Sequence, residues 1–202
     1  MAERRFHSAL QHRADRAGAK GLSIALKEMD DRGVIDVRGL PTDAGFLPAV
    51  KDVLGFDLPM DPRTSRSRGE ISALWLSTDQ WLIILPRETA PDFHARLVKS
   101  LAGIHSLVVD VSDARAIVRL EGDTVRETMN KGTSADFTDS GMKAGTVRRL
   151  LYAQVAALAH VVSTDPDVID LYVFRSYADH AWSFLLATAR EGARVKLFGK
   201  QG

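Results

Sequence analysis

Cysteine is absent from the 202 residues of the chain. Its absence excludes disulfides, thiolate zinc sites, iron–sulfur clusters and a thiol nucleophile. Long apolar runs are also lacking: no stretch approaches the roughly 18 residues of a membrane span, and residues 1–7 carry charge instead of the apolar core of a signal peptide. These features predict a cytoplasmic location without membrane contact.

An excess of either charge is missing too. The chain has 27 Lys and Arg against 26 Asp and Glu, for a net charge of +1. This balance gives no indication of a nucleic-acid partner.

Motifs that hold nucleotides or metals are not found. The sequence has no Gly-x-Gly-x-x-Gly turn, no glycine loop ending in Lys-Ser/Thr, no His-Glu-x-x-His and no Gly-x-Ser-x-Gly. None of its 6 histidines has another four residues away, the helical spacing that presents two imidazoles to one metal. We expect no metal and no cofactor in this chain. A Ser-His-Asp arrangement stays open, because such residues meet only in space.

The first 21 residues form a separate segment. Residues 1–20 hold five basic against two acidic side chains and few apolar ones, too few to offset the entropy lost on ordering. We expect a flexible basic arm over residues 1–21. An alternative is that this arm binds a nucleic acid or a membrane.

Residues 22–112 predict the order β-α-β-β-α-β. Strands are expected at 34–38, 71–76, 81–85 and 107–111, and helices at 46–54 and 93–101. Gly55 and Gly103 stand where the two helices would end.

Residues 113–202 repeat that order, with strands at 116–121, 155–162, 168–174 and 195–198 and helices at 125–129 and 182–189. Leu82 and Leu171 are 89 residues apart, as are Phe93 and Trp182. The chain is therefore interpreted as α+β, with two ferredoxin-like halves, 22–112 and 113–202, in one compact unit.

Two polar groups stand at the ends of apolar strands. Asp110, Ser112 and Arg115 follow one strand, and Arg175 and Ser176 follow another. They are interpreted as a hydrogen-bonded junction between the halves, with a ligand site as the alternative.

Four segments, in this order, resemble the gamma subunit of heterotetrameric sarcosine oxidase over about residues 22–195. They are Trp75–Leu82, Val109–Arg115, Lys131-Gly132 with Asp136-Phe137, and Asp170–Tyr177 with Trp182. The resemblance implies a fold similar to the folate-binding aminomethyltransferases, which are built from duplicated ferredoxin-like units.

It also implies a context for the chain. In that family, other subunits carry out the oxidative demethylation of sarcosine and hold FAD, FMN and NAD, with tetrahydrofolate in the alpha subunit and zinc in delta. The gamma chain brings no known cofactor. The expected partners are the alpha, beta and delta subunits, chiefly alpha.

The sequence departs from catalytic relatives of that fold. Aminomethyltransferases carry an acidic pair where this chain has residues 150–155 without an acid, and Gln154 cannot replace a carboxylate in proton transfer. Folate proteins of iron–sulfur maintenance have a cysteine after Lys-Gly, and here Thr133 follows Lys131-Gly132. The first hypothesis is thus a non-catalytic gamma subunit that stabilises the sarcosine-oxidising assembly.

The alternative is a free-standing folate-binding one-carbon transferase. It needs a pocket with a carboxylate near Asp110, Asp136 or Asp170.

Overall fold

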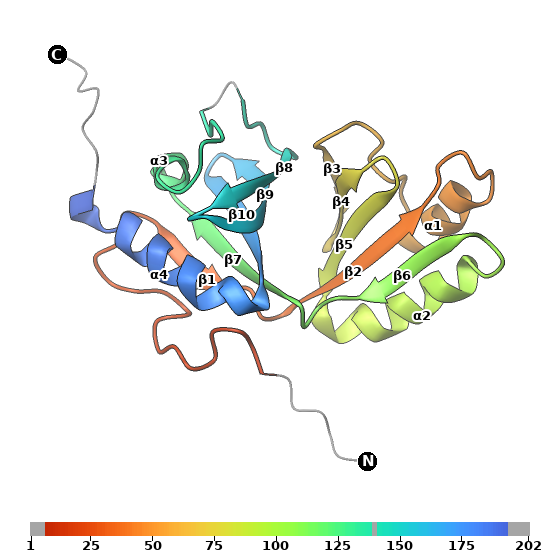
Figure 1. The fold of residues 1–202 in the computed structure, drawn as a ribbon, viewed down its shortest axis with the longest axis horizontal. Helices are drawn as coiled ribbons and strands as arrows, with labels where there is room; N and C mark the ends of the chain where they lie inside the picture. The colour runs from red at the N-terminus through yellow and green to blue at the C-terminus, as the bar shows by residue number, and fades with distance from the viewer. Residues whose placement is uncertain (1–6, 139–140, 194–202) are drawn as a thin grey trace.

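The structure, a computed structural model, describes residues 7–138 and 141–193. Two five-stranded antiparallel sheets lie side by side, with helices on their outer sides (Figure 1). Within the described residues, no helix is long and apolar enough to cross a membrane.

The first sheet has the strand order β3-β4-β5-β2-β6. Two helices, α1 and α2, connect its strands. The bounds are β2 (Arg32–Gly39), α1 (Phe46–Leu54), β3 (Ser65–Arg68), β4 (Ile71–Ser77), β5 (Gln80–Pro86), α2 (Ala90–Ser100) and β6 (Ser106–Asp110).

The second sheet has the order β1-β7-β10-β9-β8. Its elements are β1 (Ala25–Glu28), β7 (Arg115–Glu121), α3 (Val125–Asn130), β8 (Val147–Tyr152), β9 (Val155–Thr164), β10 (Asp167–Phe174) and α4 (Ala178–Thr188). Short 3-10 turns occur at Arg87–Thr89, Arg175–Tyr177 and Glu191–Ala193.

Local sequence explains the main elements. Phe46, Val50 and Leu54 recur every four residues and form the buried face of α1, which ends where Gly55 adopts a left-handed φ of 77°. Close packing at the end of β2 requires Gly39: a Cβ there would lie 2.2 Å from the Phe46 ring.

The N-terminal strand corrects the expected division of the chain. β1 belongs to the stretch 22–112 assigned to the first half, yet it pairs with β7 of the second sheet. It occupies the place beside β7 that β6 occupies beside β2. The strand expected at residues 195–198 to close the second half lies outside the described residues.

The expected flexible arm is wrong for residues 7–20, which pack against the second half. Leu10 is fully buried in the core of that half. Arg13 pairs with Asp15 and Asp179, and Arg16 pairs with Glu28. Sequence reasoning counted the charged residues of this stretch but could not see that Asp179 and Glu28, outside it, pair with Arg13 and Arg16.

Three apolar clusters hold the molecule together. One lies in each half, and the third joins the facing sides of the two sheets. The third contains Val34 and Leu82 from the first sheet and Ile117, Leu158 and Tyr172 from the second. The two halves thus share a buried interface, and polar residues stand at its edges.

Candidate functional site

Asp110 and Ser112 form a hydrogen-bonded corner where the chain leaves the first sheet. Asp110 Oδ1 accepts from the Ser112 backbone N–H at 2.9 Å and from Ser112 Oγ at 2.5 Å. Ser112 Oγ in turn accepts from the backbone N–H of Val34 in β2 at 2.9 Å. These bonds tie the Asp110 and Ser112 side chains to the adjoining chain.

Arg115 begins β7, and Arg175 directly follows β10. The Arg115 guanidinium stacks over the Phe174 ring, 4.1 Å from its centroid, and burial lowers the pKa of Arg115, with nearby Arg149 adding to that effect. Arg175 donates from Nη2 to the His7 carbonyl at 2.6 Å.

The structure brings these candidates to one connection without joining them into one cluster. The Arg175 backbone N–H donates to the carbonyl of Ala114 at 2.9 Å, which ties the end of β10 to the chain between the sheets. Ser176 lines a hollow beside Arg175. Among the described residues, no hydrogen bond links the side chains of Asp110 and Ser112 to those of Arg115 or Arg175.

A polar cavity between the sheets is a feature that sequence reasoning missed. It measures about 430 Å³ and is lined by strands of both halves. In it, Arg119 binds Asp170 with two parallel hydrogen bonds, Nε to Oδ1 at 2.7 Å and Nη2 to Oδ2 at 2.8 Å. This paired geometry is the strong form of an arginine–carboxylate contact.

His160 lies in the same cavity. Its Nε2 is 2.9 Å from Ser65 Oγ. The Ser65 hydroxyl donates its proton to the Gly145 carbonyl at 3.0 Å. Since a hydroxyl has one proton to donate, His160 Nε2 is the donor in its contact with Ser65. Burial lowers the pKa of His160 to about 4; Asp170 opposes and Arg119 adds to this shift.

These contacts do not form a Ser-His-Asp triad in this cavity. In a triad the histidine accepts the serine proton and a carboxylate orients the histidine. Here Ser65 donates elsewhere, and Asp170 directs both carboxylate oxygens to Arg119. The cavity holds a neutral imidazole and a closed ion pair, which is not the arrangement of a nucleophile and its base.

In residues 7–138 and 141–193, no group of three or more His, Asp or Glu side chains could hold a metal ion.

The fold and these contacts define a class of protein: an α+β chain with two packed antiparallel sheets, similar to aminomethyltransferase. The family follows from the sequence. Residues 38–191 match the model of the sarcosine oxidase, gamma subunit family, and the chain belongs to that family. No curated protein sequence is significantly similar to it.

Two solved structures support the fold. The heterotetrameric sarcosine oxidase from Corynebacterium sp. U-96, in complex with pyrrole 2-carboxylate, contains a chain that is similar with a TM-score of 0.84 and 19% identity, over 96% of this chain and 99% of that one. The glycine cleavage system aminomethyltransferase T from Bartonella henselae is similar with a TM-score of 0.64 and 16% identity, over 82% of this chain. This chain spans 46% of that enzyme.

Proposed function

We propose that this chain is a non-catalytic gamma subunit of a heterotetrameric sarcosine oxidase. It supports the oxidative demethylation of sarcosine to glycine with one-carbon transfer to tetrahydrofolate. The observation that carries the proposal is the family match over residues 38–191. The likeness to a chain of a heterotetrameric sarcosine oxidase over almost the full length of both chains agrees with it.

The partners in this proposal are the alpha, beta and delta subunits, chiefly alpha, in the cytoplasm. FAD, FMN, NAD, tetrahydrofolate and zinc belong to those partners. The role of this chain is to stabilise the assembly, not to contribute reacting groups.

The contacts of three carboxylates support a non-catalytic role. Asp110 accepts from Ser112 and Asp136 accepts from Thr138 at 2.8 Å, while Asp170 is paired with Arg119. A one-carbon transferase needs a carboxylate that meets its substrate, and the alternative places that carboxylate near one of these three residues.

We also infer that the two halves repeat one ferredoxin-like unit. The strand order β6-β2-β5-β4 in the first sheet corresponds to β1-β7-β10-β9 in the second. In the first sheet a helix follows β2 and another follows β5; in the second a helix follows β7 and another follows β10. The repeat is complete only because β1 supplies the edge strand of the second sheet.

Co-expression of the tagged chain with its three cognate subunits tests the proposal. We expect all four to co-purify in a fixed ratio, and elution of this chain alone would contradict the proposed role. Calorimetric titration of the isolated chain with tetrahydrofolate is expected to be flat, and heat at micromolar concentrations would favour the one-carbon transferase instead.

A further inference from the structure

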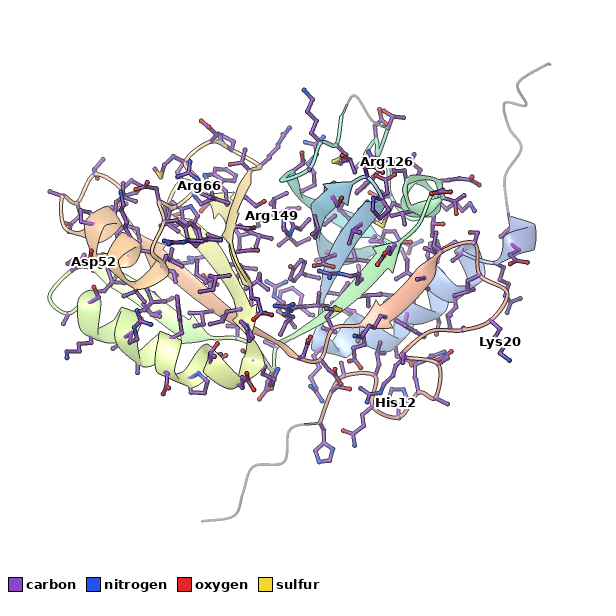
Figure 2. All side chains as sticks on the ribbon, turned by 180° about the vertical axis from the view of Figure 1, so that it is seen from behind. His12, Lys20, Asp52, Arg66, Arg126 and Arg149 are labelled. Carbon is purple, nitrogen blue, oxygen red and sulfur yellow. The ribbon has the colours of Figure 1, made fainter. Side chains whose placement is uncertain are left out.

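Three hollows adjoin one another along the boundary between the halves, since each shares lining residues with the next. The first, of about 480 Å³, shares Leu76 and Arg149 with the second, of about 220 Å³. The second shares Ala156 and Phe174 with the third, of about 930 Å³. Arg149 projects between the two halves (Figure 2).

We call this feature the arginine groove because of its charge. Its lining has one acidic residue, Asp113, which is already paired with Arg87. Against it stand six arginines: Arg38, Arg63, Arg115, Arg148, Arg149 and Arg175.

None of these six arginines forms an ion pair within the described part of the chain. Where their guanidinium groups donate hydrogen bonds, the acceptors are neutral: Arg38 donates to the Gln80 amide oxygen at 2.8 Å, and Arg175 to the His7 carbonyl. Elsewhere in the described chain, arginines such as Arg119 and Arg126 are paired with carboxylates, although Arg68 and Arg96 donate to backbone carbonyls instead. The groove therefore holds an excess of positive charge.

Arg115 carries its charge in a half-buried position beneath the groove. Burial is the main cause that lowers its pKa; the opposite charge of Asp36 raises the pKa, and the like charge of Arg149 lowers it by less. A negative group placed in the groove would add a favourable interaction with Arg115 and Arg149.

The groove also presents large apolar side chains. Leu151 is 64% exposed beside the first hollow, and Phe174 and Tyr177 are each 42% exposed beside the third. Exposed apolar groups bordered by unpaired arginines are typical of a protein interface, in which aromatic residues and arginine are enriched.

We propose that the arginine groove binds a segment of another subunit of the assembly, one in which Asp or Glu side chains alternate with apolar ones. The succession of three hollows fits an extended segment better than a compact small anion, and the unpaired arginines call for carboxylates. This inference rests on the proposed function, and it goes beyond it by assigning the docking surface and the chemistry of what docks there.

Charge reversal in the four-subunit complex tests the proposal. Arg38 and Arg149 are both exposed, so Arg38→Glu with Arg149→Glu is compared with a control pair, Arg96→Glu with Arg190→Glu, which reverses two exposed charges outside the groove. We expect the groove pair to weaken binding to the other subunits at least about tenfold. The control pair is expected to weaken it less than about threefold.

The outcomes separate the two proposals. Equal weakening by both pairs would overturn the groove assignment and leave the proposed function standing. Failure of the unmodified chain to co-purify would overturn both. If the melting temperature shows that the groove pair does not fold, Arg38→Gln with Arg149→Gln is judged by the same comparison.

Cross-linking identifies what occupies the groove. Because the chain lacks cysteine, Leu151→Cys creates a unique thiol beside the first hollow for a photoactivated cross-linker. We expect a cross-linked peptide from another subunit that contains Asp or Glu next to apolar residues. A peptide without acidic residues, or one from a second copy of this chain, would overturn the proposal.

Discussion

The buried histidine of the polar cavity makes the stability of this protein depend on pH. His160 is 5% exposed, and burial lowers its pKa to about 4 from an ordinary value near 6.5. Between these two values the unfolded chain binds a proton that the folded chain rejects. The free energy of unfolding therefore falls as the pH drops from about 6.5 to about 4, and His160 has no further effect below that.

The size of the effect follows from the shift. A difference of about 2.5 pKa units corresponds to about 3 kcal/mol once both states are protonated. At pH 5 the unfolded histidine is almost fully protonated while the folded one is still mostly neutral. We expect about 2 kcal/mol of the free energy of unfolding to be lost by that pH, relative to pH 8.

Urea unfolding of the wild type and of His160→Gln, measured from pH 8 to pH 5, checks this expectation. Glutamine can still donate to Ser65 Oγ but does not titrate. The wild type should lose about 2 kcal/mol more than the variant over this range. His94→Gln, at a part-buried histidine on α2, is the matched control and should keep the wild-type slope. Equal slopes for the wild type and His160→Gln would refute the reasoning.

Three further predictions concern stability. Gly39→Ala places a Cβ 2.2 Å from the Phe46 ring and should lower the free energy of unfolding by about 1–3 kcal/mol in urea titrations, with an unchanged midpoint arguing against this close packing. Ser112→Ala leaves the Val34 N–H without its acceptor, and calorimetry should show a loss of about 1–3 kcal/mol, whereas a neutral result would mean that water replaces the hydroxyl. Leu10→Ala empties a fully buried site and should destabilise the protein by about 2–5 kcal/mol and speed proteolysis within residues 7–20, so unchanged cleavage would contradict the packed arm.

Local patterns predicted most of the elements, because their causes lie within a few residues of each other. The apolar residues of β4 and β5 stand between turn residues, a pattern that predicts a hairpin. Gly55 stands where the expected helix should end, and α1 does end there. Pattern and structure agree in the same way for β9 and β10.

The strands that were missed depend on partners far along the chain. β1 has four residues with alternating burial, and its partner β7 follows about 90 residues later. β3 contains Arg66 and β8 contains Arg149. Their sequences predict a polar loop in the first case and no element in the second, because each is an edge strand with one exposed face. Short edge strands carry little signal of their own, because their stability comes from the strand beside them.

Part of the polar cavity could be predicted from the sequence. Arg119, Asp170 and His160 are direct neighbours across β7, β10 and β9, so the correct register places them in one row. The sequence does not predict that this row of side chains faces the first sheet, where Ser65 contacts His160. The sequence suggests no ion pair for Asp170, because its pairing with Arg119 depends on the cross-strand contact.

The near-zero net charge conceals a separation of charge in space. The chain has 27 basic and 26 acidic residues, yet six arginines and one aspartate line the arginine groove, so the rest of the molecule must be acidic in balance. The groove attracts a short acidic segment once that segment is within about 10 Å, the screening length at moderate salt. A balanced chain with one unpaired basic groove is thus suited to a specific protein partner, and its association should weaken as salt is added.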